Sequence, residues 1–392
     1  MKILLLGVGM QGKAALHDLV HHDAVREIIA ADLDIEALRS HIEDKQYGHK
    51  VRCEQVDAAN PENLNRLIGS GADVIINLLP KQFINTIAEA AIVHGIHMVF
   101  TSYITPEVAA MANEAKAKNI TILPEFGLDP GIDLVLLGHA VRSLDTVDDI
   151  LCYGAGFPEP AAANNAIKYK VSWTFEGVMQ SYRRAGLVIR NGKVVTISDS
   201  EMFAPENIHL IDIPGIGTLE AFPNGDALKY ADLLGIERSK LQTIGRYAMR
   251  WPGHCAFWKA MIDLHLLDSE PVLIDGKAID RKQYLAAAMA PHLQYGADER
   301  DVTVVRVEVK GQLNGEQKHL VYQMIDKRDL ETGLMSMNRT VGFTVSIGAL
   351  MIGTGQIAKR GLLSPINDIP FEPFAQELAT RGIQITSWLT AD

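Results

Sequence analysis

The first third of the chain alternates short apolar runs with amphipathic segments. A short apolar run fits a buried strand, and apolar residues spaced three or four apart fit a helix. The expected strands are Lys2–Leu6, Glu27–Ala31, Val51–Gln55, Asp73–Leu78, His97–Phe100 and Thr121–Leu123. The expected helices between them are Gln11–His21, Ile35–Asp44, Pro61–Ile68, Phe83–Val93 and Pro106–Ala117. Repeated strand–helix units predict the α/β class, as a doubly wound parallel sheet of the Rossmann type.

A glycine- and proline-rich break at 126–131 ends this pattern, and such clusters are typical of domain linkers. Three strand-like stretches follow the break, at 168–175, 187–197 and 302–310. Together with the helical segments between them they predict an inserted α+β domain. A small-residue helix at 342–361 is expected to pack on the first domain. We therefore expect a dinucleotide-binding domain over 1–128, completed by 340–392, and a substrate-binding and dimerisation domain over 129–339.

Composition excludes several kinds of partner. The formal net charge of -11 over 392 residues argues against nucleic acid, which is bound by clustered Lys and Arg. The apolar run at 341–355 is shorter than the roughly 20 residues of a membrane span, so no membrane is expected. Cys53, Cys152 and Cys255 form no CxxC pair, and the start of the chain has no signal-peptide pattern. We expect a cytoplasmic protein without a disulfide framework or a bound metal.

A glycine motif follows the first expected strand and opens the first expected helix. It reads Gly7-Val8-Gly9-Met10-Gln11-Gly12, a GxGxxG sequence. In this context the first glycine makes a tight turn and the second lets the backbone approach a pyrophosphate. The third lets the helix pack closely on the strand. The motif, with Met10 and Gln11 at the start of the helix, predicts a dinucleotide site.

Asp32 follows the second expected strand, twenty residues after Gly12. An acidic residue there accepts hydrogen bonds from the adenosine ribose and repels a 2′-phosphate, so NAD is expected rather than NADP. The alternative for Asp32 is an N-cap of the next helix, a role for which Asp34 is better placed. Asp57 is a candidate for the adenine side. Further cofactor contacts are expected at strand ends, from Asn77, Leu78, Pro80, Ser102 and Gly127.

These motifs together resemble the saccharopine dehydrogenase family, including its lysine 6-dehydrogenase relatives. The segments that carry the resemblance are 7–12, 101–103, Gly127-Leu128-Asp129-Pro130-Gly131-Ile132-Asp133, 169–173, 219–224 and 246–254. The resemblance implies a Rossmann domain and an inserted domain that binds an amino-acid substrate and forms a homodimer. It also implies the reversible oxidation of a carbon–nitrogen bond by a nicotinamide cofactor.

The resemblance also suggests where the substrate binds. The expected substrate contacts are Tyr103, Asp129, Pro130, Gly131, Tyr153, Trp173, Arg246 and His254. Asp129 is our candidate for the base that takes a proton from the amine, with Lys168 or His254 as alternatives. Arg246 is expected to hold a carboxylate, because its guanidinium binds carboxylates bidentately. It is one of a set of four arginines, Arg183, Arg184, Arg246 and Arg250.

The chain departs from the family pattern at two places. Gly154 stands where some members have a cysteine, and Gly225 stands where many have the arginine of a Pro-Asn-Arg-Asp segment. The segment 176–178 and Tyr182 are closer to the lysine 6-dehydrogenases. A saccharopine-type secondary amine is expected as substrate, with oxidative deamination of free lysine as the alternative. Two readings of other classes stay open: a non-catalytic NAD(H)-binding redox sensor, and a structural dimer whose Rossmann fold is empty.

Overall fold

The computed structural model describes residues 1–391 and divides the chain into two compact units. The first unit consists of residues 1–138 and 338–384, and the second of residues 139–337 and 385–391. The first division falls about ten residues later than expected, inside helix α7 (Ile132–Arg142), which begins in the first unit and ends in the second. Residues 385–391, predicted to complete the first domain, belong to the second unit.

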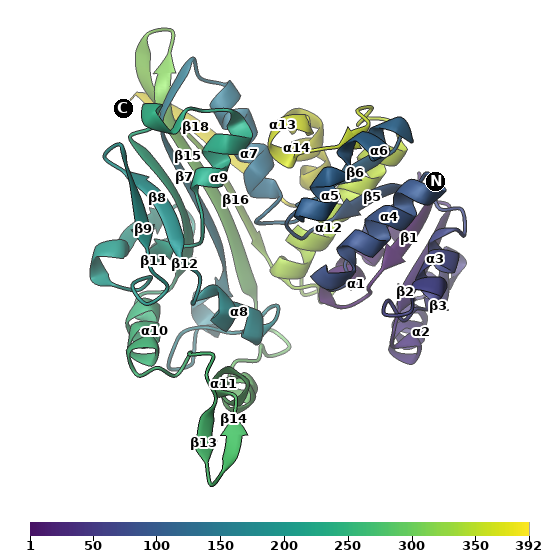
Figure 1. Ribbon diagram of the computed structural model, residues 1–392, viewed down its shortest axis with the longest axis horizontal. Coiled ribbons are helices and arrows are strands. Elements are labelled where there is room, and N and C mark those ends of the chain that lie inside the picture. Colours follow the sequence, from purple (N-terminus) through teal and green to yellow (C-terminus); the bar gives the residue numbers. More distant parts are fainter. Residues whose placement is uncertain (392) are drawn as a thin grey trace. The chain divides into compact units, whose positions relative to one another are not determined.

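The first unit is built on a seven-stranded sheet in the order β17-β6-β5-β4-β1-β2-β3, and every neighbouring pair is parallel. The strands are β1 (Lys2–Leu6), β2 (Glu27–Asp32), β3 (Val51–Gln55), β4 (Val74–Asn77), β5 (His97–Phe100), β6 (Thr121–Leu123) and β17 (Gly361–Leu362). Six of them are the strands that the sequence predicts. The seventh, β17, comes from the C-terminal part of the chain (Figure 1).

Helices cover both faces of this sheet. They are α1 (Met10–Val20), α2 (Ile35–Asp44), α3 (Pro61–Ile68), α4 (Ile84–His94), α5 (Pro106–Ala110), α6 (Ala112–Ala117), α12 (Ser336–Gly353), α13 (Pro365–Asp368) and α14 (Phe371–Thr380). Helices α3 and α4 pack on the face that carries Met98 and Phe100. Helix α12 approaches the other face, where Gly348 lies against Val99. Successive strand residues point to opposite faces, so the doubly wound prediction is confirmed.

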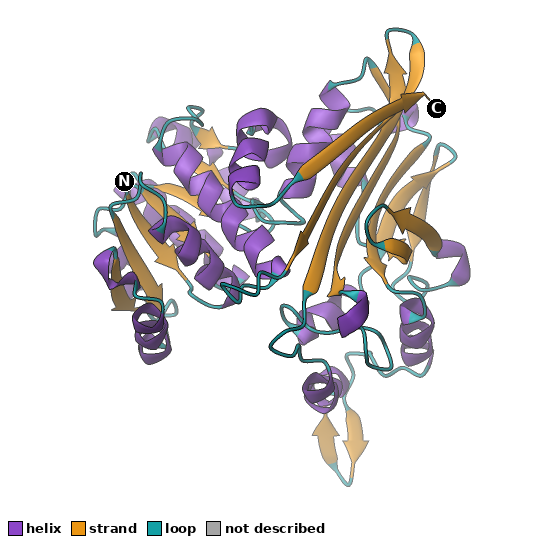
Figure 2. Ribbon diagram, turned by 180° about the vertical axis from the view of Figure 1, so that it is seen from behind, coloured by secondary structure: helices purple, strands orange, loops and turns teal. Residues whose placement is uncertain are grey.

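The second unit contains a nine-stranded mixed sheet, with seven strands in the order β10-β11-β12-β7-β15-β16-β18 and β8 and β9 attached at β12. The strands are β7 (Thr146–Pro158), β8 (Gly186–Arg190), β9 (Lys193–Ile197), β10 (His209–Ile213), β11 (Gly217–Pro223), β12 (Thr243–Arg250), β15 (Asp301–Leu313), β16 (Glu316–Lys327) and β18 (Ile385–Ala391). In this sheet the pair β7–β12 is parallel, and the other neighbouring pairs are antiparallel. The long strands are β7, β15 and β16, and Figure 2 shows long strands side by side in this sheet.

Short helices and a small hairpin complete the second unit. They are α8 (Phe175–Ser181), α9 (Leu228–Leu234), α10 (His254–Asp263), α11 (Arg281–Met289), and the strands β13 (Val272–Ile274) and β14 (Lys277–Ile279). The strand predicted at 302–310 is confirmed within β15. The strand predicted at 168–175 is wrong, since this stretch is irregular and leads into α8. The stretch 187–197 is a hairpin, because Asn191 and Gly192 turn the chain with φ of 51° and 71°.

Candidate cofactor and substrate sites

The residues expected to bind the cofactor gather at one edge of the first sheet. Gly7 follows β1, Asp32 ends β2 and Asn77 ends β4. Because these strands are neighbours and parallel, their carboxyl ends lie at the same edge. An open α/β sheet binds its ligands at this edge, next to the point where the strand order reverses.

The glycine turn leaves a cradle with no side chain inside it. Gly7 has a φ of 88°, and a Cβ atom there would lie 3.0 Å from the carbonyl carbon of Leu78. A Cβ atom on Gly12 would collide with the carbonyl oxygen of Gly7, so the third glycine permits close packing of helix on strand. A Cβ atom on Gly9, by contrast, would meet nothing within 4 Å. The open space is therefore at Gly9, where the backbone approaches a pyrophosphate in this motif.

Helix α1 begins at this cradle without a side-chain cap at Gly9. Within residues 1–391 the first-turn N–H groups of Met10, Gln11 and Gly12 have no hydrogen-bond acceptor. Unpaired N–H groups and the helix dipole make such an end attractive to an anion. A pyrophosphate would supply the missing acceptors, so the observed geometry fits a dinucleotide.

Asp32 lies at the carboxyl end of β2 and also accepts a hydrogen bond from the glycine turn. Its Oδ2 accepts a hydrogen bond from the N–H of Val8 at 2.7 Å, and its Oδ1 accepts one from Asp34 at 3.2 Å. Helix α2 is capped by Asp34, whose Oδ1 accepts from the N–H of Ala37 at 3.0 Å, so the N-cap alternative for Asp32 is not observed. The next residue, Leu33, is 63% exposed.

Asn77 offers a buried hydrogen-bond donor at the same edge. The side chain is 2% exposed, and its Oδ1 accepts a hydrogen bond from the N–H of Leu79 at 3.0 Å. Its Nδ2 is buried without a partner in the part of the chain that the structure describes. An unsatisfied buried donor is costly, and an oxygen of a bound cofactor would satisfy it. Leu78 and Pro80 continue from Asn77 along this edge, and their side chains are more exposed.

The other expected cofactor contacts lie on loops. Asp57 is exposed, and its Oδ1 accepts a hydrogen bond from the N–H of Ala59 at 2.9 Å, so it shapes the turn before α3. Ser102 follows β5, and its carbonyl accepts from Glu125 at 3.1 Å. Tyr103 is 47% exposed. The loops after β5 and β6 are thus joined at the carboxyl edge.

The segment 127–133 closes on itself after β6. The N–H of Gly127 donates to the carbonyl of Pro130 at 3.0 Å, and a Cβ atom on Gly131 would collide with Gly127. Asp133 is 3% exposed, and its carboxylate accepts from the N–H of Gly131 at 2.7 Å. Asp133 therefore holds the turn, whereas Asp129, next to the cis bond to Pro130, is half-buried.

In the second unit Arg246 and Tyr153 lie on opposite faces of the sheet. The register pairs Arg246 with Cys152 and Tyr247 with Tyr153, and Tyr153 stacks on Tyr247 with ring centroids 5.3 Å apart. Adjacent strand residues point to opposite faces. The sheet therefore separates the side chains of Tyr153 and Arg246, so these two residues, both expected to contact the substrate, do not lie on one face. Tyr153 is buried and its hydroxyl lies 3.2 Å from Nε2 of His209.

His254 lies inside an aromatic core, with Tyr169, Tyr182, Phe222 and Trp258 around its ring. It is 1% exposed, and its Nε2 lies 2.8 Å from the hydroxyl of Tyr182. Burial, and secondarily the charge of Arg250, hold the pKa of His254 well below its ordinary value. The structure therefore gives no support to the substrate contact or the proton transfer expected of His254, because its side chain is enclosed by the protein. Lys168 is exposed, and its Nζ donates to the carbonyl of Pro252 at 3.4 Å.

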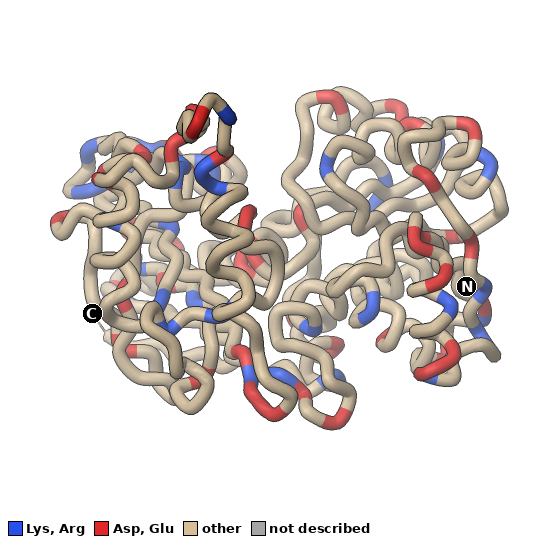
Figure 3. The backbone as a smooth tube through the Cα atoms, turned by 90° about the horizontal axis from the view of Figure 1, so that it is seen from below, with Lys and Arg blue, Asp and Glu red and all other residues tan. Residues whose placement is uncertain are grey.

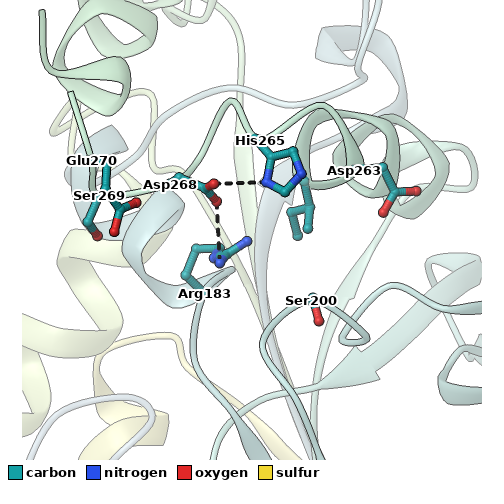
Figure 4. Close-up of a pocket in the computed structure, with 8 residues that line it drawn as sticks. Arg183, Ser200, Asp263, His265, Asp268, Ser269 and Glu270 are labelled. Carbon is teal, nitrogen blue, oxygen red and sulfur yellow. Dashed lines mark hydrogen bonds and ion pairs between the residues drawn. The ribbon is translucent and has the colours of Figure 1, made fainter. Parts of the chain in front are cut away.

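Two further residues of the second unit are half-buried near α8 and α10. Trp173 packs against Gly177 at the start of α8. Arg183 forms ion pairs with Asp199 at 2.9 Å and with Asp268 at 3.5 Å. Figure 4 shows the guanidinium of Arg183 directed at Asp268 in a surface pocket of about 430 Å³. Arg183 is thus neutralised by the protein's own carboxylates.

Charge and metal-binding groups are spread over the molecule. Figure 3 shows basic and acidic positions interspersed along both units. Within residues 1–391 no three His, Cys, Asp or Glu side chains are grouped so that they could hold a metal ion. The same residues include no helix with the length and hydropathy of a membrane span. The anion-attracting features are local, at the start of α1 and around Arg246.

The first unit is a dinucleotide-binding Rossmann domain, and the second is a mixed-sheet domain with a buried arginine. The chain matches the family model described as the saccharopine dehydrogenase NADP binding domain over residues 3–123. It matches the saccharopine dehydrogenase C-terminal domain over residues 127–383. The chain belongs to the saccharopine dehydrogenase family.

Several relatives are similar along nearly the whole chain. The saccharopine dehydrogenase [NADP(+), L-glutamate-forming] of Saccharomyces cerevisiae is 26% identical, over 97% of this chain and 97% of the yeast protein. The mitochondrial alpha-aminoadipic semialdehyde synthase of Bos taurus is 25% identical, over 99% of this chain and 48% of the synthase. The chain thus spans about half the length of such synthases. Apo saccharopine dehydrogenase (L-Glu forming) from Saccharomyces cerevisiae has the same fold, with a TM-score of 0.88 at 23% identity and full coverage of both chains.

Proposed function

We propose that the chain is an NAD(P)-dependent oxidoreductase that acts on a carbon–nitrogen bond of an amino-acid substrate. The observation that carries this proposal is the start of α1, which has no side-chain cap at Gly9 and where a Cβ atom on Gly9 would meet no atom within 4 Å. This arrangement supports binding of a dinucleotide pyrophosphate. Membership of a family whose relatives are named saccharopine dehydrogenases supports the reaction class.

We further propose a preference for NAD over NADP, although the yeast relative is named for NADP(+). Asp32 puts a carboxylate at the end of β2, where the adenosine ribose lies in this fold. The residues from Leu33 to Leu38 include no arginine, and the guanidinium of Arg39, the next residue, is paired with Glu36 at 3.0 Å. Titrating the purified protein with NADH and NADPH, followed by nucleotide fluorescence, tests this preference. Equal affinities would contradict it.

A bound nicotinamide would supply the hydride acceptor. The protein's residues would bind the substrate, orient it and take the proton of its amine. We assign Asp129 as the base that takes a proton from the substrate amine, because it is the carboxylate of the 127–133 turn that does not hold Gly131. Ser102 and Tyr103 would line the nicotinamide end of the edge. Arg246 would hold a substrate carboxylate, with its guanidinium oriented by the hydrogen bond from Nη1 to the carbonyl of Asn224 at 3.0 Å.

A saccharopine-type secondary amine is the proposed substrate, ahead of free lysine. The match to saccharopine dehydrogenase models over both units supports this order. Gly225, where many members have an arginine, argues the other way. Following NADH formation with saccharopine and with lysine at matched concentrations decides between them. Turnover of lysine alone would reverse the order, and no turnover of either would remove the enzymatic proposal.

Assembly and compartment complete the proposal. A homodimer is expected from the resemblance. Size-exclusion chromatography with light scattering tests it, because a dimer has twice the chain mass of 43.0 kDa. Three free thiols, at Cys53, Cys152 and Cys255, are compatible with the reducing conditions of a cytoplasm.

A further inference from the structure

Two chain segments of the second unit run side by side next to Arg246. The N–H of Leu187, in β8, donates to the carbonyl of Gly225 at 3.2 Å, and the N–H of Ala227 donates back to the carbonyl of Leu187 at 2.9 Å. These bonds fix the segment before β8 against the loop after β11. Arg184, three residues before Leu187, is thereby brought to this loop.

Two arginine side chains converge on Gly225. A Cβ atom on Gly225 would lie 3.4 Å from Cδ of Arg184 and 3.8 Å from Nη1 of Arg246. The glycine has a φ of 78°, which L side chains rarely adopt. The position where many family members have an arginine is therefore side-chain-free here, and arginines from two other segments lie next to it.

The charge of Arg184 is not neutralised by the protein. Its side chain is exposed, and within residues 1–391 it has neither an ion pair nor a hydrogen-bond partner. Its neighbour Arg183 differs, because Asp199 and Asp268 pair with it. The carboxylate next in sequence to Gly225, that of Asp226, accepts the N–H of Leu228 at 2.9 Å at the start of α9.

The side chains of Arg184 and Arg246 both reach Gly225, and two arginines next to the same residue favour an anion there. Like charges close together repel each other, and a carboxylate that binds both removes the repulsion while forming charge-assisted hydrogen bonds. Arginine suits this role because its planar donors match the two carboxylate oxygens. Arg246 is 7% exposed and would supply the buried side of such a site, and Arg184 the solvent side.

We propose that Arg184 and Arg246 together bind one carboxylate of the substrate over Gly225, so that Arg184 supplies the cation missing at position 225. The substrate class that this site selects is an amino acid with an additional carboxylate, such as the glutamate part of a secondary amine. The inference rests on the proposed function for the identity of the ligand, whereas the anion site itself can be tested without turnover.

The direct test measures binding of glutarate, a dicarboxylate without an amine, by calorimetry to the full-length protein without nucleotide. R184M removes the charge and keeps the length of the side chain. R183M is the matched control, because Arg183 is already paired with protein carboxylates. We expect R184M to weaken glutarate binding at least tenfold and R183M to change it less than twofold. R184K should lie between R184M and the unsubstituted protein, since lysine keeps the charge but not the planar donors.

Kinetics then connect the site to catalysis. With saccharopine, R184M should raise KM about tenfold with little change in kcat, and the KM for lysine should stay nearly the same. Glutarate binding that is absent from the unsubstituted protein, or unchanged in R184M, would overturn the inference. If the unsubstituted protein turns over neither amine while R184M still loses glutarate, the proposed function fails and the anion site stands.

Discussion

The carboxylate of Asp32 accepts a hydrogen bond from the backbone N–H of Val8 at 2.7 Å, inside the glycine turn. One side chain therefore does two things: it puts negative charge where the ribose is expected, and it holds the turn that faces the pyrophosphate. A substitution that removes both functions cannot tell them apart, so the charge must be changed while the hydrogen bond is kept.

D32N keeps an oxygen acceptor for Val8 and removes the negative charge. We expect NAD affinity to fall severalfold and NADP affinity to rise, because the repulsion of a 2′-phosphate is gone. Fluorescence titration with the two reduced nucleotides measures the ratio. D34N is the control, since asparagine also caps helices and Asp34 serves α2. An unchanged ratio in D32N would show that Asp32 does not discriminate between the cofactors.

Alanine substitutions at Gly12 and at Gly9 should have different effects, the first on stability and the second on nucleotide binding. G12A drives a Cβ into the carbonyl of Gly7 and should destabilise the first unit by about 1–3 kcal/mol, as overpacking does. G9A meets no protein atom within 4 Å and should fold normally, yet it puts a methyl group where the pyrophosphate is expected. Thermal melts with and without NADH separate the two effects. Normal NADH binding by G9A would argue against the cradle as the pyrophosphate site.

R246K keeps the charge of the proposed carboxylate anchor and removes its forked donors. We expect the KM for the amine substrate to rise about tenfold or more, the cost of losing one charge-assisted hydrogen bond. NADH affinity should not change, because Arg246 belongs to the other unit. An unchanged KM would mark Arg246 as a structural residue that only holds Asn224.

Asp301 predicts a pH dependence of stability. It is fully buried, its carboxylate accepts from Ser336 at 2.7 Å and from Met337 at 3.0 Å, and burial raises its pKa to about 6. Between pH 4 and 6 the folded state therefore binds more protons at this site than the unfolded state does. The contribution of Asp301 to the free energy of unfolding falls as pH rises through this window, by at most about 1.4 kcal/mol per pH unit.

Urea unfolding of the unsubstituted protein and of D301N, at several pH values from 4 to 7, measures this contribution. D301N cannot titrate, so the difference in free energy of unfolding between the two proteins should shift in favour of D301N as pH rises. A difference that is constant over this range would contradict the raised pKa.

Six strands of the first sheet could be predicted almost to the residue because their signals are local, whereas β17 was not predicted. Asp34 and Asn60 cap α2 and α3 through their own side chains, and the glycine turn fixes where β1 ends and α1 begins. The helix expected over 106–117 divides at Met111, which has no side-chain signal of its own. Sequence patterns succeed where a few neighbouring residues determine the backbone.

The second unit was predicted less well, for one local and one long-range reason. The stretch 168–175 is apolar enough for a strand. However, Asn165 binds the backbone of Tyr169 through both its side-chain oxygen and its nitrogen, at 3.2 Å and 2.7 Å. Such local bonds compete with sheet formation. The face occupied by Tyr153 depends on how β7 pairs with β12, whose residues lie about a hundred positions later, and no local pattern gives that register.

The position of Arg184 next to Gly225 could not be predicted either, because the two residues are far apart in the sequence. In the sequence Arg184 is one of four arginines of the second unit, and the motifs indicate a role only for Arg246. Its place beside Gly225 comes from hydrogen bonds between β8 and the loop after β11, which sequence patterns do not show. The missing arginine at Gly225 was visible in the sequence, and what lies next to it was not.

Strand β17 pairs with β6 although the two are about 240 residues apart, and the chain passes between the units three times. During synthesis the edge of β6 therefore stays without its partner until residues 361–362 have left the ribosome. The N-terminal domain cannot finish folding first, as N-terminal domains generally do. A nascent chain stalled before residue 361 should expose that edge to chaperones, and cutting the gene at one boundary cannot yield either unit whole.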